Sequence, residues 1–419
     1  MPLLVMKFGG TSVADLSRIE NAARKVQREV ERGFDVIVIV SAMSGKTNEL
    51  VGWVEATSKL YDAREYDAVT SSGENVTAGL MALRLQEMGI PARSWQGWQV
   101  PINTTSAHGA ARFVSIPRDN IDAKFAEGFK VAVVAGFQGV SPEGRITTLG
   151  RGGSDTTAVA FAAAFQAMRC DIYTDVDGVY TTDPRITSKA RKLDKIAYEE
   201  MLELASLGAK VLQTRSVELA MRYKVRLRVL SSFEDSDDTS GTLVCDEDEI
   251  MESKVVSGVA HSRDEAKMTL VKVEDRPGIA AAIFGPLADA GVNVDMIVQN
   301  ISEREDPADK RAYTDMTFSC PTNQVLRAQK AMEDARAAGL FSYADLVVDT
   351  DVAKISVVGI GMRSHAGVAA RMFSALAAEN VNIKVIATSE IKISVLIDRK
   401  YMELAVQALH DAFDLDKAA

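Results

Sequence analysis

The sequence predicts an α/β protein with a mostly parallel central sheet, followed by two copies of a smaller α+β unit. Three observations lead to this fold class. They are a series of short unbroken apolar runs, a helical pattern between the first two runs, and an internal repeat in the last third of the chain. The 419 residues suffice for two to four domains, and a composition of 47% hydrophobic and 25% charged residues is ordinary for a globular protein.

The first part of the chain carries the apolar runs that are typical of buried parallel strands. The runs are mainly apolar rather than alternating, so both faces of each strand should be covered. Apolar residues then recur at helical spacing from Leu16 to Val30, and Gly33 ends this helix. The order strand, helix, strand is a βαβ unit, which predicts an α/β domain. The runs are residues 3–8, 36–40 ("VIVIV"), 131–135 ("VAVVA") and 171–174.

An acidic stretch marks the end of this domain. Residues 233–250 contain eight acidic side chains and no lysine or arginine, as in a solvated linker or a domain edge. The predicted boundaries are 1–245 for the α/β domain, 246–266 for a linker with one strand, and 267–349 and 350–419 for the two repeated units.

The repeat becomes visible when residues 275–297 are aligned with residues 364–386 at a constant offset of 89. Each copy has the pattern βαββα. The first copy gains a final strand at 344–349, the second copy lacks one, and a spare strand at 254–260 precedes both. We predict that the spare strand crosses over to complete the second unit, so that the two units interlock. Pairs at this offset include Gly278 with Gly367, Phe284 with Phe373 and Asn293 with Asn382.

Composition excludes several classes of function. A net charge of -10 argues against broad nucleic-acid binding, which needs a basic face. No apolar run reaches the ~20 residues of a membrane span, and the N-terminus lacks a signal-peptide pattern, so a cytoplasmic protein is expected. Cys170, Cys245 and Cys320 lie far apart, which indicates neither a disulfide framework nor a zinc site. The four histidines lack metal-ligand spacing, and no protein metal site is expected.

Lys7 ends the first apolar run, in "VMKFGGTSV". Ligands of open parallel sheets bind beyond the carboxyl ends of the strands, which is where this lysine lies. A lysine within an apolar strand is costly unless its ammonium meets an anion, and Gly9 and Gly10 would let backbone N–H groups approach a phosphate. The alternative is a lysine that reaches solvent beside a glycine turn.

The loop after the second run, "VSAMSGKTNEL", ends in Gly45, Lys46 and Thr47 but is not a Walker A motif. That motif requires glycine where Val40 stands. Ser41 and Thr47 remain candidate ligand contacts, with a solvated turn as the alternative.

Two helix starts add charged groups to the candidates. Glu74 in "SSGE" either complements the helix dipole or binds an ammonium group. In "TTLGRGGSDTTAVAFAAAF", Arg151 offers a planar fork for a carboxylate, and Ser154 and Asp155 stand at the start of a helix, where anions bind. Helix capping alone is the alternative there. The loop in "YTDVDGVYTTDPR" follows another strand and should face the same crevice as Lys7.

The motifs "KFGGTSV", "SAMSGKTNEL", "SSGE", "GRGGSDTTA", "TDVDGVYTTDPR" and "SLGAKVLQ" stand in the order found in aspartokinases of the amino-acid kinase family, which this chain resembles. The repeat resembles the paired ferredoxin-like ACT regulatory units of those enzymes. The resemblance spans nearly the whole chain. It implies phosphoryl transfer from MgATP to the side-chain carboxylate of L-aspartate, the first step of lysine, threonine and methionine biosynthesis. A carboxylate is already ionised at pH 7, so the reaction needs no general base.

The resemblance also implies a role for each motif residue. Lys7 would bridge the phosphates and stabilise the transferred group, and Asp155 would position Lys7. Glu74 would bind the ammonium of aspartate, and Thr47 would help to orient the substrate. Arg151 and Ser154 would hold the carboxylates, and Mg²⁺ would be held mainly by phosphates and water. The implied nucleotide-binding residues are Lys7, Phe8, Gly9, Gly10, Thr174, Asp175, Tyr180, Arg185, Lys210 and Val211.

By the same resemblance, the repeated units imply feedback by lysine, threonine or both, and a homo-oligomer that associates through these units. The alternative is that the matched residues only maintain strand and turn geometry. A polar stretch at 302–313 bears on the choice of effector, and Met251 could start a separate regulatory chain, as in some relatives. The implied effector contacts are Asp275, Gly278, Ala280, Asn293, Asp295 and Gln299 in the first unit, and Asn382, Ile383, Ser389 and Glu390 in the second.

Two rival functions stay open from the residues. One is another amino-acid kinase, acting on glutamate, acetylglutamate or a nucleoside monophosphate, and the other is a non-catalytic amino-acid sensor. Glu74 together with Arg151 favours a free amino acid as substrate, and the repeat favours an aspartokinase. The presence of Lys7 and Asp155 favours catalysis over sensing alone.

Overall fold

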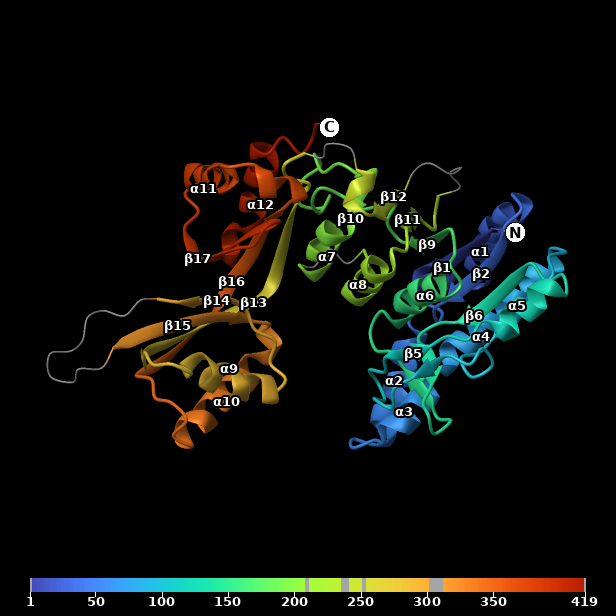
Figure 1. The fold of residues 1–419 in the computed structure, drawn as a ribbon, viewed down its shortest axis with the longest axis horizontal. Helices are drawn as coiled ribbons and strands as arrows, with labels where there is room; N and C mark the ends of the chain where they lie inside the picture. Colours follow the sequence, from blue (N-terminus) through green and yellow to red (C-terminus); the bar gives the residue numbers. More distant parts are fainter. Residues whose placement is uncertain (1, 208–210, 235–240, 251–253, 301–311, 418–419) are drawn as a thin grey trace. The chain divides into compact units, whose positions relative to one another are not determined.

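The computed structural model describes residues 2–207, 211–234, 241–250, 254–300 and 312–417. These residues pack into two compact units (Figure 1). Unit 1 contains the described residues up to Val179, residues 192–206 and those between 211 and 250. Unit 2 contains residues 180–191, Leu207 and the described residues from 254 onward. The packing therefore places residues 180–191, which fall within the predicted α/β domain, in unit 2.

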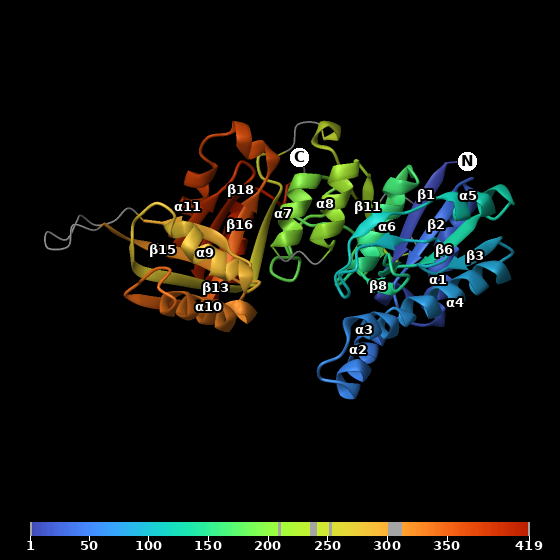
Figure 2. The same ribbon diagram turned by 60° about the horizontal axis from the view of Figure 1, so that its bottom comes forward.

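Unit 1 is built around an eight-stranded sheet in the order β10-β12-β11-β9-β1-β2-β6-β3 (Figures 1 and 2). Neighbouring strands are parallel except β11 and β12. The apolar runs predicted as strands are β1, β2, β6 and β9, and this part of the prediction is confirmed. The strands are β1 (Leu3–Phe8), β2 (Asp35–Val40), β3 (Ala92–Trp95), β6 (Val131–Ala135), β9 (Arg169–Thr174), β10 (Lys195–Ala197), β11 (Leu227–Ser231) and β12 (Thr242–Cys245).

Helices cover both faces of this sheet, which explains why its central strands are mainly apolar. Leu4, Met6 and Phe8 of β1 share one buried core with α1 and α4. Successive side chains of a strand alternate between faces, so Lys7 points to the other face, where α6 packs. The helices of unit 1 are α1 (Leu16–Glu31), α2 (Lys46–Thr57), α3 (Ala63–Thr70), α4 (Ser72–Glu87), α5 (Asp119–Ala126), α6 (Gly153–Ala164), α7 (Tyr198–Ser206) and α8 (Thr214–Tyr223).

A second, small sheet in unit 1 leads directly into α6. Its strands have the order β5-β4-β7-β8, and α3 packs against β8. Because β8 ends at Thr148 and α6 begins at Gly153, this sheet fixes the start of the segment that carries Arg151. The strands are β4 (Asn103–Thr104), β5 (Phe113–Ser115), β7 (Gln138–Val140) and β8 (Ile146–Thr148).

Unit 2 contains one six-stranded antiparallel sheet in the order β14-β15-β13-β16-β18-β17. Two helices cover each copy of the repeat. Met268, Leu287 and Phe318 lie in the core of the first copy, and Ile355 and Leu409 lie in that of the second. The elements are β13 (Gly258–Glu274), α9 (Ile279–Asp289), β14 (Asp295–Gln299), β15 (Tyr313–Cys320), α10 (Val325–Ala337), β16 (Asp345–Val358), α11 (Val368–Ala378), β17 (Ile383–Thr388), β18 (Lys392–Asp398) and α12 (Met402–Ala412).

Two long strands, β13 and β16, run through both copies. Residues 258–262 of β13 pair with residues 354–358 of β16, within the sheet of the second copy. Val256 and Val259 lie in the core of that copy. The sequence suggested separate strands on either side of residues 261–267, whereas β13 is continuous because its backbone keeps pairing with β16, with register shifts near Glu265.

Three of the predicted features lie outside the described residues. These are Lys210, Met251 and residues 302–311 of the polar stretch, although Tyr313 begins β15. Among the helices that the structure describes, none combines the length and the apolar character that crossing a bilayer requires.

Candidate active site

Lys7 and Asp155 form a buried ion pair beside the carboxyl ends of β1 and β2. The Lys7 Nζ and Asp155 Oδ1 atoms are 2.5 Å apart, and the two side chains are 9% and 12% exposed. Within the described part of the chain, no second partner of Lys7 Nζ is found, so this ammonium keeps donors for a phosphate. The predicted neighbourhood of Lys7 and Asp155 is thus present.

Gly9 lies close to the ammonium group of Lys7, and Gly10 lies close to the loop after β2. A Cβ atom at Gly9 would lie 3.3 Å from Lys7 Nζ, and one at Gly10 would lie 3.1 Å from the carbonyl oxygen of Ala42. The Gly9 N–H donates to the carbonyl oxygen of Tyr173 at 3.2 Å. Gly9 therefore does not offer the free backbone donor that the sequence suggested. Phe8 points away from this ammonium group and stacks on Tyr173 at 4.8 Å.

Glu74 lies near the loop that follows β2. The Glu74 Oε1 atom accepts a hydrogen bond from the Ala42 N–H at 3.0 Å. Gly73 allows this approach, because a Cβ atom there would lie 2.7 Å from the Ala42 Cβ atom. The Glu74 residue is 3% exposed, its Oε2 atom is buried without a partner among the described residues, and burial raises its pKa to about 7. A buried carboxylate oxygen without a donor fits an ammonium ligand better than a helix-dipole contact.

Arg151 and Ser154 lie at the turn into α6. Arg151 is exposed, whereas Ser154 is buried. Gly152 has φ +72, and a Cβ atom there would lie 1.9 Å from Gln213 Cγ, so only glycine fits this turn. Arg215 of α8 fixes the preceding backbone by donating to the carbonyl oxygens of Leu149 at 3.0 Å and Ala111 at 2.9 Å.

Thr47 lies in the first turn of α2, after the same β2 strand. It is half-buried, and the Ser41 N–H donates to the Phe8 carbonyl oxygen at 3.1 Å, which joins this loop to the end of β1. Lys46 is exposed and pairs with Glu49 at 2.6 Å. A Walker A lysine would point at a phosphate, so the geometry agrees with the rejection of that motif.

The predicted nucleotide-binding residues are divided between the two units. Thr174 ends β9 at the same sheet edge as Lys7, and its hydroxyl donates to the carboxylate of the exposed Asp175 at 3.1 Å. Tyr180 and Arg185 belong to unit 2, where Arg185 pairs with Asp183 at 2.7 Å. Val211 is half-buried ahead of α8, and Lys210 lies outside the described residues.

The predicted effector residues of the first copy lie on and just before β14, just after β13 and at the start of α9. The Asp295 carboxylate pairs with Lys354 at 2.9 Å, and Gln299 donates to Asp275 at 3.3 Å. Lys354 lowers the pKa of Asp295 against the opposing effect of burial. The Asn293 and Ala280 residues are exposed. Gly278 precedes α9 with φ +89, so backbone geometry alone accounts for its glycine.

The predicted effector residues of the second copy lie at the two ends of β17. Ile383 begins this strand and Asn382 precedes it. After the strand, the Ser389 N–H donates to the Lys392 carbonyl oxygen at 2.8 Å, and Glu390 pairs with Arg363 at 3.6 Å. Each of the two edge strands also adds a side chain to one small core, formed by Met296 of β14, Val385 of β17, and Val352 and Leu396.

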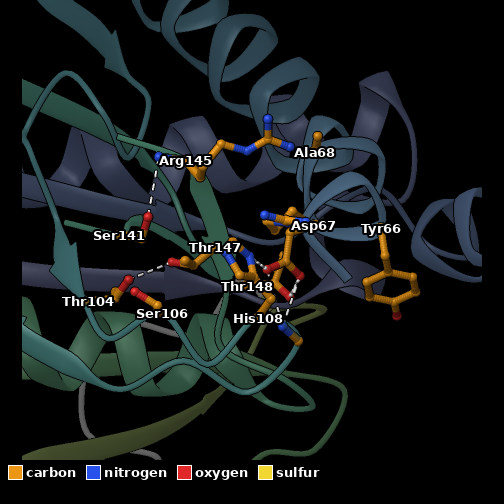
Figure 3. A network of polar contacts seen from close by, with 12 residues as sticks. Tyr66, Asp67, Ala68, Thr104, Ser106, His108, Ser141, Arg145, Thr147 and Thr148 are labelled. Carbon is orange, nitrogen blue, oxygen red and sulfur yellow. Dashed lines mark hydrogen bonds and ion pairs between the residues drawn. The ribbon is translucent and has the colours of Figure 1, made fainter. Parts of the chain in front are cut away.

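Sequence reasoning missed a buried polar network in unit 1, centred on Asp67 of α3 (Figure 3). Asp67 of α3 is fully buried and accepts hydrogen bonds from His108, Gly109 and Thr148. The sequence offers no spacing signal for it, because Asp67 stands in an ordinary polar helix and His108 in a loop. The signal arises only when the small sheet brings β8 beside α3.

Comparisons with known proteins match both parts of the chain. The model of the amino acid kinase family matches residues 2–231, and two ACT domain models match residues 267–337 and 355–413. The aspartate kinase Ask_LysC of Stutzerimonas stutzeri is 53% identical over 419 residues, which cover 100% of this chain and 99% of that protein.

Two solved structures of E. coli aspartokinase III are similar along the whole chain. Its complex with aspartate and ADP, in the R-state, has a TM-score of 0.81 at 27% identity and covers 98% of this chain and 99% of that one. Its complex with lysine and aspartate, in the T-state, has a TM-score of 0.74 at 26% identity, with the same coverage. The predicted fold class, an amino-acid kinase fold followed by two ACT units, is confirmed. The chain belongs to the amino acid kinase family, as an aspartokinase with two ACT domains.

Proposed function

We propose that the site beside β1 and β2 holds L-aspartate and ATP for direct phosphoryl transfer, which gives 4-phospho-L-aspartate and ADP. The observation that carries this proposal is the buried Oε2 atom of Glu74, which lacks a partner among the described residues and suits the ammonium group of an amino acid. The complex of E. coli aspartokinase III with aspartate and ADP supports it.

The transfer needs cations more than it needs a base. An oxygen of the aspartate side-chain carboxylate bonds to the γ-phosphorus, and the bond from that phosphorus to the β,γ-bridging oxygen breaks. Two like charges about 4 Å apart cost about 4 kcal/mol at an effective dielectric near 20. Lys7 offsets this repulsion and the charge that develops in the transition state, and Asp155 holds its ammonium in place.

The remaining residues bind and orient the amino acid. Arg151 receives a carboxylate of aspartate, since its exposed guanidinium offers two parallel donors. Ser154 adds a hydroxyl from the first turn of α6, and Thr47 adds one from α2. Thr174 and Asp175, with Tyr180, Arg185, Lys210 and Val211, form the proposed nucleotide set.

Mg²⁺ would enter with the nucleotide. In this proposal the ion is held mainly by the phosphates and water. When bound, the ion neutralises part of the phosphate charge.

We also propose that unit 2 senses the end products lysine, threonine or both, and joins subunits into a homo-oligomer. The complex of E. coli aspartokinase III with lysine and aspartate supports an effector role for the ACT domains. The reaction would then be the regulated first step of lysine, threonine and methionine biosynthesis. Size-exclusion chromatography with light scattering, with and without lysine and threonine, tests the assembly.

Trapping of the acyl phosphate with hydroxylamine tests the reaction itself. MgATP with aspartate should give the hydroxamate, and replacing aspartate with glutamate or acetylglutamate should abolish it. Adding lysine, threonine or both should then lower the yield. A product with glutamate alone would favour the rival amino-acid kinase, and no product with any acceptor would favour a sensor.

A further inference from the structure

We infer that Asp67, His108 and Thr148 form a positioning cluster that sets the distance between the two ends of the aspartate site. They are positioning residues that act through Glu74 and Arg151. The inference rests on the proposed function, because it assumes that Glu74 binds the ammonium and Arg151 a carboxylate of aspartate.

Asp67 is the centre of the cluster (Figure 3). Its Oδ1 atom accepts from the Thr148 hydroxyl at 2.5 Å and from the Gly109 N–H at 3.1 Å, and its Oδ2 atom lies 2.7 Å from His108 Nδ1. The residue is fully buried. A buried carboxylate is stable only when donors saturate it, so the loss of one donor leaves a charge that the surrounding segments must move to satisfy.

Asp67 and its donor Thr148 lie on the two segments that carry the proposed substrate contacts. Asp67 lies in α3, which runs through Ser71 into α4 and reaches Glu74 after seven residues. Thr148 ends β8, three residues before Arg151. A hydrogen bond between the side chains of Asp67 and Thr148 therefore links the segment that holds Glu74 to the segment that holds Arg151.

The surrounding backbone makes this link stiff. The Ala111 N–H donates to the Thr148 carbonyl oxygen at 2.9 Å, which joins the loop of His108 to the end of β8. Arg215 then ties Leu149 to Ala111 through their carbonyl oxygens. A shift of Thr148 would thus also move the backbone of the turn that carries Arg151.

His108 adds a second constraint on the same carboxylate. Its Nδ1 atom donates to Asp67, because the carboxylate only accepts. Its side chain is 8% exposed, and its Nε2 atom is buried without a hydrogen-bond partner among the described residues. The ring therefore serves to hold Asp67. Among the described residues it has no second hydrogen bond that could compensate if the bond to Asp67 were lost.

Thr148 offers the cleanest test, since its hydroxyl can be removed or kept with little change of shape. Thr148→Val should raise KM for aspartate about tenfold, because a hydrogen bond to a charged group is lost. KM for ATP should change by less than about twofold, and Thr148→Ser should restore KM for aspartate. Asp67→Asn should act in the same direction more strongly. Asp62→Asn, at the exposed start of the same helix, should change neither KM.

Thermal unfolding of each variant shows whether it folds, and Thr148→Val keeps the test available if Asp67→Asn does not. The inference is overturned if Thr148→Val leaves KM for aspartate unchanged, if it raises both KM values alike, or if Thr148→Ser is equally impaired. Failure of the proposed function gives a different result, because the unsubstituted enzyme would then not phosphorylate aspartate.

Discussion

Glu74 is a buried carboxyl group whose protonation state would affect the proposed binding of aspartate. Burial raises the pKa of this carboxyl from 4.5 to about 7, so the folded protein favours the protonated form. Glu74 therefore contributes stability at low pH, and this contribution is lost as the pH rises from about 4.5 through about 7. Binding of an ammonium group, in contrast, needs the ionised form of Glu74.

We expect KM for aspartate to rise as the pH falls below about 7, approaching a tenfold increase per pH unit, because Glu74 must lose its proton to bind the substrate. The measurement is KM for aspartate from pH 5.5 to 8.5 with ATP saturating. Glu74→Gln should have a high KM at every pH and lack this dependence. A pH profile of Glu74→Gln that matches the unsubstituted enzyme would assign the titration to another group.

Lys7 is expected to be indispensable for turnover. Lys7→Ala should lower kcat by at least about 1000-fold, because it removes the cation that faces the transferred group. The fold should remain, as checked by circular dichroism. The matched control is Lys46→Ala, which removes the exposed lysine of the Gly-Lys-Thr sequence and should leave kcat unchanged. Substantial residual activity of Lys7→Ala would mean that the role assigned to Lys7 is wrong.

At the scale of whole elements, the interlocked strands of unit 2 determine which substitutions damage which copy of the repeat. Val259 precedes the first copy in sequence, yet its side chain lies in the core of the second copy. The two copies share β13 and β16, so neither copy has a complete sheet of its own.

Val259→Asp should destabilise unit 2 by about 3 kcal/mol or more, because it buries an unpaired carboxylate. The matched control is Val347→Asp on β16. Val259 is 1% exposed and Val347 is 48% exposed, so the control should unfold near the temperature of the unsubstituted protein. Differential scanning calorimetry compares the two. Equal unfolding temperatures would mean that Val259 does not lie in the core in solution.

The same elements show what the sequence reveals and what it hides. Strand β1 was predictable because residues 3–6 are an unbroken apolar run, and Gly9 marks the end of the strand. The continuity of β13 could not be predicted, because residues 261–265 are polar and resemble a turn. Backbone pairing with β16 keeps these residues in the strand. Motif residues such as Lys7 could be found from their place after a strand. Asp67 could not, because its role depends on donors 41 and 81 residues away.

At the scale of the whole molecule, the chain leaves unit 1 after Val179 and returns at Lys192. The intervening segment is held within unit 2 by α12. The Thr181 hydroxyl lies 2.9 Å from His410 Nε2, and both groups are buried. Gln407 donates to the Ile186 carbonyl oxygen at 2.7 Å. Two residues proposed to bind the nucleotide, Tyr180 and Arg185, thus lie on a segment that belongs to unit 2.

Thr181→Val should raise KM for ATP several-fold and leave KM for aspartate unchanged, because it removes the buried hydrogen bond to His410. Lys189→Ala is the control on the same segment. It removes only an exposed ion pair with Asp411, which contributes little to stability. Initial-rate kinetics with each substrate varied in turn provide the measurement. Unchanged KM for ATP in Thr181→Val would separate this segment from nucleotide binding.

The shared strands also set the order of events during synthesis. Gly258 pairs with Val358, which leaves the ribosome 100 residues later, so the segment that opens unit 2 must wait for its partner. Contacts between residues so distant in sequence form slowly. Until β16 emerges, residues 258–262 present an unpaired edge that other chains could join. Residues 258–262 therefore cannot complete their pairing with β16 until about 100 further residues have been made.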